Sequence, residues 1–135
     1  MSRPTRAPQF AYPRLWWGLG WALVALVIFF SLEPKAPEVP GDPGNWSGHL
    51  LAYGTLAGWF TRLLYARRSR LIALAMLVSM GVVLEFLQGM TGYRTYDPFD
   101  MLANTCGVLL GLLLAPPRLP NGLPMLERCV RRVAG

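Results

Sequence analysis

The chain has few charged residues and little cysteine. Only 15% of its 135 residues are charged, whereas a soluble domain carries about a quarter. The polar surface of an ordinary water-soluble fold is therefore missing. The two cysteines, Cys106 and Cys129, are too few for a disulfide framework. The sequence also contains no nucleophile elbow, phosphate-binding loop or zinc motif that would support an enzyme. His49, Glu85 and Asp100 could in principle bind a divalent ion, but they come from three separate apolar segments without a compact ligand motif, so we predict no metal site and no cofactor.

Four long apolar segments account for the shortage of charge. Each is 17 to 20 residues long, which is about the length that crosses a hydrocarbon core of roughly 30 Å. None of the twelve prolines lies inside a segment, as expected if each segment is one helix. We therefore predict an all-α integral membrane bundle of four transmembrane helices, at Leu15–Leu32, Gly48–Tyr65, Leu71–Met90 and Phe99–Ala115.

Basic residues predict the orientation and the domain limits. Eleven of the thirteen Lys and Arg lie in the N-terminal tail, the loop around Arg68 or the C-terminal tail. The positive-inside rule then places both termini in the cytoplasm. We expect a basic tail at 1–14, a membrane domain at 15–115 and a basic tail at 116–135, which either forms a short helix on the inner leaflet or is a frayed end. Membrane lipids are the expected partners, and nucleic acid is not.

Polar residues of three predicted helices gather at the outer rim of the bundle. Glu85 follows fourteen residues without a charge, and a carboxylate inside a membrane span usually faces a protein interior or a watery cavity. The predicted ligand-binding residues are His49, Tyr53, Glu85, Gln88, Arg94, Asp100 and Asn104. With Asp97 included, the carboxylates and the arginine of this rim sum to −2. That charge favours sugar hydroxyls, an amine-bearing head group or proton exchange over a phosphate.

Simpler structural roles compete with that pocket. Asp97 before Pro98 reads as a helix N-cap. Glu85 and Arg94 could form a buried ion pair that fixes a turn. The GxxxG patterns of the second and fourth helices predict close packing. The first helix lacks ionisable residues between 15 and 32, so we expect it to be a peripheral scaffold.

The spacing of the polar residues resembles a known family. The pattern comprises His49-x-x-x-Tyr53, then Glu85-x-x-Gln88, and then Arg94 followed by Asp100-x-x-x-Asn104-x-x-Gly107. It is similar to the VanZ-like family of small bacterial membrane proteins, over residues 45–112. Asn45 and Trp46 stand where family members often carry Asp-Lys, which alters the charge near His49. The resemblance implies a cell-envelope role in the bacterial cytoplasmic membrane, related to teicoplanin resistance.

Three functions follow as expectations. The first is a protein that binds an amphiphilic or lipid-linked envelope molecule, or a glycopeptide, without catalysis. The second is an intramembrane acid–base enzyme that acts on a lipid-linked envelope substrate, with Glu85 or His49 as the base and Arg94 as the charge stabiliser. The third is a proton-linked carrier, which at four helices would need to form a homo-oligomer.

Overall fold

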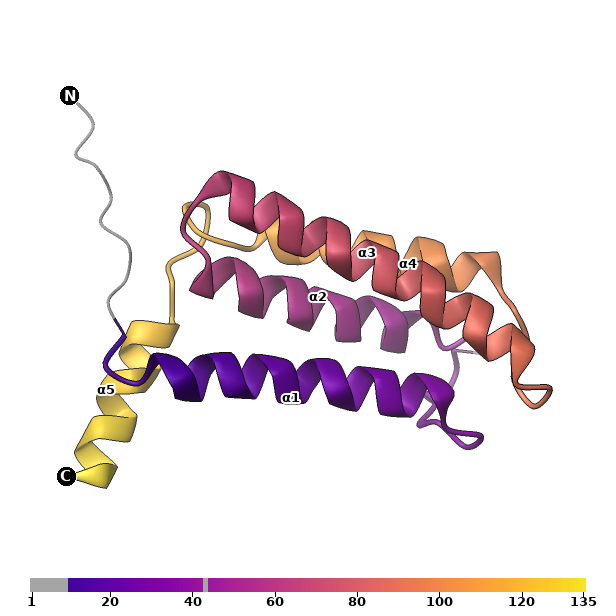
Figure 1. The fold of residues 1–135 in the computed structure, drawn as a ribbon, viewed down its shortest axis with the longest axis horizontal. Coiled ribbons are helices and arrows are strands. Elements are labelled where there is room, and N and C mark those ends of the chain that lie inside the picture. Colours follow the sequence, from indigo (N-terminus) through magenta and orange to yellow (C-terminus); the bar gives the residue numbers. More distant parts are fainter. Residues whose placement is uncertain (1–9, 43) are drawn as a thin grey trace.

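Five helices and no strands make up the part of the chain that the computed structural model describes, residues 10–42 and 44–135. Helices α1 to α4 lie side by side, and α5 crosses the end of this group at the start of α1 (Figure 1). The helices are α1 (Pro13–Leu32), α2 (Trp46–Leu63), α3 (Arg67–Met90), α4 (Pro98–Leu113) and α5 (Leu123–Ala134). The predicted all-α class is thus confirmed.

The helix ends follow from local chemistry. Asp97 accepts a hydrogen bond from the backbone N–H of Phe99 at 2.9 Å and Pro98 occupies the first turn, so the predicted N-cap is confirmed. The largest difference from the predicted segments is at α3, which begins at Arg67 instead of Leu71. The extra turn holds basic residues that an apolar run cannot reveal.

The outside of the helix group is largely apolar, and several polar side chains are buried inside it. Glu85 and Gln88 are only 1% and 2% exposed, while Leu51 and Met90 are 70% and 80% exposed. Large exposed apolar surfaces mark contact with lipid or with partners. Within the described residues, α1 and α3 are long and apolar enough to cross a membrane, and α4 is a shorter apolar helix. Four spans and their orientation remain predictions.

Helices α2 and α4 meet backbone to backbone. A Cβ on Gly107 would lie 2.5 Å from the carbonyl oxygen of Leu50, and one on Gly111 would lie 2.7 Å from that of Gly54. Only glycine allows this approach, which confirms the packing role predicted for the GxxxG patterns. The seam brings the polar residues of α2 and α4 within contact distance.

Helix α1 is held at its two ends. At the end of the helix group where α1 begins, the indole of Trp59 donates to the carbonyl oxygen of Trp16 at 3.0 Å. At the opposite end, the amide of Gln88 donates to the carbonyl oxygen of Ser31 at 2.7 Å. These contacts satisfy one of the free carbonyls at the end of the helix. The middle of α1 packs against the core through Leu23, Val24 and Val27.

Candidate functional site

His49 joins α2 to α4 through both of its ring nitrogens. Nδ1 lies 3.0 Å from Oδ1 of Asn104, and Nε2 lies 3.3 Å from Oδ2 of Asp100. A doubly protonated ring satisfies both acceptors, whereas a neutral ring satisfies one. Asp100 and Asn104 are one turn apart, so α4 presents both to the same side chain. The seam of glycines below keeps the two helices close enough for this bridge.

Glu85 is bound to the loop before α4. Its Oε1 accepts a hydrogen bond from the backbone N–H of Asp97 at 2.6 Å. The residues that the structure describes contain a single ion pair, between His49 and Asp100, so the alternative of a Glu85–Arg94 pair is not formed. Glu85 therefore fixes the connection between α3 and α4 through a backbone amide.

Three buried oxygens at this end of the helix group have no hydrogen-bond partner among the described residues. They are Tyr53 Oη, Glu85 Oε2 and Asp100 Oδ1. An unpaired polar atom in a buried place costs about 1–3 kcal/mol. Native structures contain few such atoms, and each calls for a physical explanation. Asp100 contacts His49 directly and Tyr53 lies one helical turn from it on α2, so two of the three oxygens belong to neighbours of this histidine.

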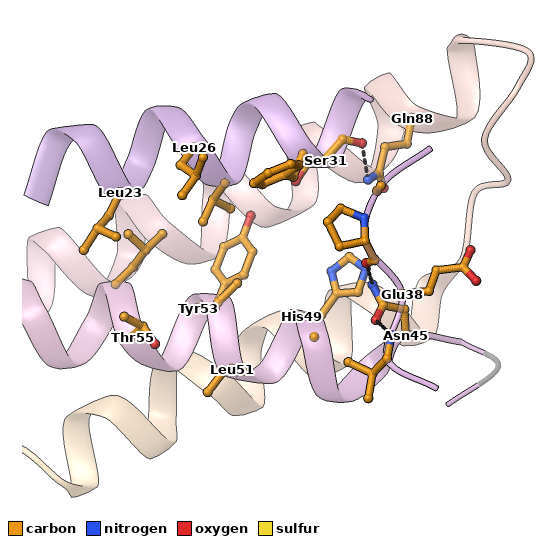
Figure 2. Close-up of a pocket in the computed structure, with 18 of the residues that line it drawn as sticks. Leu23, Leu26, Ser31, Glu38, Asn45, His49, Leu51, Tyr53, Thr55 and Gln88 are labelled. Carbon is orange, nitrogen blue, oxygen red and sulfur yellow. Dashed lines mark hydrogen bonds between the residues drawn. The ribbon is translucent and has the colours of Figure 1, made fainter. Parts of the chain in front are cut away.

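A cavity of about 370 Å³ lies between α1, α2 and the loop that joins them. Figure 2 shows Leu23 and Leu26 of α1 at one end of its lining, and His49, Asn45 and Gln88 at the other. The hydroxyl of Tyr53 points from α2 toward α1, into the space between the two helices. The cavity has the size of a small-molecule site, which typically measures about 300–1,000 Å³.

The structure divides the predicted site residues into two groups. His49, Tyr53, Gln88 and Arg94 line the cavity, whereas Glu85, Asp100 and Asn104 lie outside its lining. The predicted charge of −2 came from three carboxylates and one arginine. None of the three carboxylates, those of Glu85, Asp97 and Asp100, lines the cavity. The charged side chains of its lining are Arg94 and Glu38, with His49 as a third when it is protonated. The lining of this cavity therefore lacks the charge of −2 from which a preference against phosphate was predicted.

Helix α1 supplies a wall of the cavity, which the sequence did not indicate. Leu23, Leu26 and Val27 line it, although α1 was expected to be a peripheral scaffold. Ser31 is the one polar residue that α1 adds to this lining, and a single serine near a helix end carries no signal in the sequence. The role follows only from where the helix packs.

Asn45 and Trp46 also have defined positions. The side chain of Asn45 accepts from the backbone N–H of Val39 at 3.1 Å and donates to the carbonyl oxygen of Pro37 at 3.2 Å. It thereby ties the loop between α1 and α2 down over the cavity. The indole of Trp46 packs on Phe99 with a ring separation of 5.5 Å. The two residues that depart from the family's Asp-Lys pattern are therefore neutral structural contacts beside His49.

Comparisons with known proteins agree with the residue pattern. The family described as VanZ/LLP1 matches residues 19–119. An uncharacterized protein of Schizosaccharomyces pombe is 32% identical over 94 residues, which cover 67% of this chain and 58% of the relative. The chain thus spans little more than half the length of that relative. No solved structure matches the chain.

Proposed function

This chain belongs to the VanZ/LLP1 family, and from that premise we propose that it binds an amphiphilic molecule in the cavity between α1 and α2. The observation that carries the proposal is the composition of the cavity wall. Leucine and valine side chains line one part, and His49, Gln88 and Arg94 line the other. A wall that changes from apolar to polar along its length matches a molecule with a chain and a head group.

The surroundings of the cavity support access from a bilayer. Leu26, Phe30 and Leu51 line the cavity and are also exposed at the surface of the helix group. An opening bordered by exposed apolar side chains faces hydrocarbon if α1 to α4 cross the membrane as predicted. A ligand would then pass between α1 and α2 without its chain entering water, and that avoids the cost of hydrating the chain.

The polar end of the cavity supplies the contacts for a head group. The Tyr53 hydroxyl is buried, has no partner among the described residues and points into the space between the helices. Arg94 brings a guanidinium, which recognises phosphate and carboxylate groups through paired N–H donors. With the carboxylates of Glu85 and Asp100 outside the lining, an anionic head group fits this end as well as a sugar does.

An acid–base enzyme is the second candidate, and one contact favours it. His49 lines the cavity and its Nε2 contacts the Asp100 carboxylate, which is the pairing that a general base uses. Because Asn104 and Asp100 engage both ring nitrogens, one of these contacts must open before the ring can accept a proton from a ligand. Glu85 is a weaker candidate for the base because it does not line the cavity. Retained lipid of unchanged mass supports binding. Conversion of the lipid by the wild type, lost in His49→Gln, would establish the enzyme.

Native mass spectrometry of the purified protein tests the proposal. We expect the wild type to retain a lipid, and Ala52→Trp or Leu26→Trp to lose it, because both residues line the cavity from opposite walls. Leu109→Trp is the matched control, since Leu109 is an exposed leucine of α4 outside the cavity lining. Equal lipid retention in all four proteins would rule out this cavity as the binding site.

A link to glycopeptide resistance is tested with the same variants. The resemblance to the VanZ-like family motivates measuring teicoplanin susceptibility in bacteria that express the chain. If the cavity serves resistance, the wild type and Leu109→Trp lower susceptibility, and Ala52→Trp does not. Protection by Ala52→Trp equal to that by the wild type would separate resistance from the cavity.

A further inference from the structure

Helix α5 has two chemically different sides. At 100° per residue, Leu126, Val130 and Val133 fall on one side of its 12 residues. The arginines at 128, 131 and 132 fall on the other. Leu126 and Val133 are exposed, so no described part of the chain covers this apolar side. A helix with a basic side and a bare apolar side is typical of segments that lie in the membrane interface.

The position of α5 fits that setting. Figure 1 shows α5 lying crosswise to α1 to α4, at the end of the helix group where α1 begins. If those four helices run along the membrane normal, α5 runs along the membrane plane. At the same end, the first turn of α3 carries further arginines, Arg67 and Arg68. This end therefore presents a concentration of positive charge to the surface that it meets.

A specific contact fixes α5 to α1. Glu127 Oε1 accepts from the indole N–H of Trp16 at 3.0 Å and from the backbone N–H of Tyr12 at 2.9 Å. Burial alone would raise the pKa of the Glu127 carboxyl, but these hydrogen bonds outweigh burial and lower it. Leu123, at the start of α5, is buried as well. The helix is thus docked at one edge and leaves its apolar and basic sides free.

We propose that α5 lies flat in the membrane interface and binds the head groups of anionic phospholipids through Arg128, Arg131 and Arg132. Its apolar side enters the hydrocarbon boundary, and Glu127 holds it at the level of the first turn of α1. The proposed placement of α5 is independent of the cavity. It rests on the proposed placement of α1 to α4 in a membrane. Each arginine near an anionic leaflet favours the bound state about fivefold, so three together favour it roughly a hundredfold.

The test uses the full chain with one labelled cysteine. Cys106→Ser leaves Cys129 of α5 as the single thiol, and both are exposed. An environment-sensitive fluorophore is attached to Cys129. The protein is reconstituted into nanodiscs of phosphatidylcholine, with or without phosphatidylglycerol. Resistance of the protein to extraction by alkaline carbonate verifies that the helix group is inserted. If insertion fails, the membrane placement on which both proposals rest is wrong.

We expect phosphatidylglycerol to shift the label to shorter wavelength and to protect it from aqueous iodide, and added salt to reverse both effects. Replacing Arg128, Arg131 and Arg132 with Gln should remove the dependence on phosphatidylglycerol. The control is Arg118→Gln, which lies before α5 and should retain it. A label that stays open to iodide in anionic discs, or an anionic effect that survives the triple replacement, overturns the proposal. The cavity is assayed separately by retained lipid, so the failure of one proposal does not imply that of the other.

Discussion

Replacing Tyr53 with Phe separates a binding role from a structural one. The change removes a single oxygen from a side chain that is 2% exposed and leaves the ring in place. Because that oxygen has no partner among the described residues, its removal breaks none of the hydrogen bonds found there. The ring packs with Leu56, Phe60 and Val108, so the core keeps its volume.

Tyr53→Phe is expected to raise the stability of the lipid-free protein and to lower its affinity for a ligand. Relief of an unpaired buried hydroxyl should raise the free energy of unfolding of the lipid-free protein by about 1–3 kcal/mol. If the hydroxyl instead binds a ligand, its loss should cost the ligand one hydrogen bond, about 0.5–1.5 kcal/mol, which corresponds to roughly a 2- to 13-fold weaker Kd. Tyr53→Phe is therefore expected to be more stable without lipid and weaker in binding.

Tyr93→Phe provides the contrast. The hydroxyl of Tyr93 donates to the carbonyl oxygen of Leu32 at 2.8 Å, so its removal breaks a hydrogen bond and should lower stability by about 0.5–1.5 kcal/mol. Tyr93 does not line the cavity, and its replacement should leave lipid affinity unchanged.

The assay compares thermal or denaturant unfolding of delipidated protein in detergent with lipid binding by native mass spectrometry. Destabilisation of the lipid-free protein by Tyr53→Phe of the same size as by Tyr93→Phe would show that the hydroxyl has a partner in the native state. Unchanged lipid affinity in Tyr53→Phe would place the head group elsewhere. Either result contradicts a ligand-binding role for an unpaired Tyr53 hydroxyl.

Three further changes test the architecture. Gly107→Ala should destabilise the protein by about 1–3 kcal/mol in thermal unfolding, because its Cβ would lie 2.5 Å from a carbonyl oxygen of α2. The control is Gly18→Ala, which should not destabilise the protein because a Cβ there has no atom within 4 Å. Asp97→Ala should cost about 1 kcal/mol in the same assay through loss of the α4 cap. The folded-state pKa of Glu127 is lowered, so the docking of α5 is fully present above the unfolded pKa of about 4.3 and should be lost as pH falls through the lowered value. Tryptophan fluorescence between pH 7 and pH 3 measures this, with Trp16→Phe as the blank, and a signal that is independent of pH contradicts it.

The sequence predicted the helices and the polar end of their assembly well. Apolar runs without internal proline predicted four helices within four residues of their ends. The cost of exposing backbone in an apolar setting forces such runs into helices. The bridge from His49 to Asp100 and Asn104 was also foreseeable. Residues one turn apart share a face, and glycines on the same face of α4 bring it against α2.

Only the tertiary structure decided which of these polar residues reach the cavity. Glu85 and Asp100 lie outside its lining, whereas Tyr53 and Arg94 line it. Helical periodicity shows that a residue faces the protein interior, but it does not show whether that residue reaches the cavity. The hydrogen-bond partner of Glu85 could not be predicted from the sequence either. That partner is the backbone N–H of Asp97, and every residue except proline has a backbone N–H.

Composition and local spacing were enough to predict that the chain is all-helical, apolar on its outside and polar at one end. The tertiary structure decided that α1 forms a wall of the cavity and that Glu127 docks α5 against Trp16. The reason is physical: an apolar helix face looks the same in sequence whether it packs on protein, meets lipid or borders a cavity. Its neighbours alone distinguish the three.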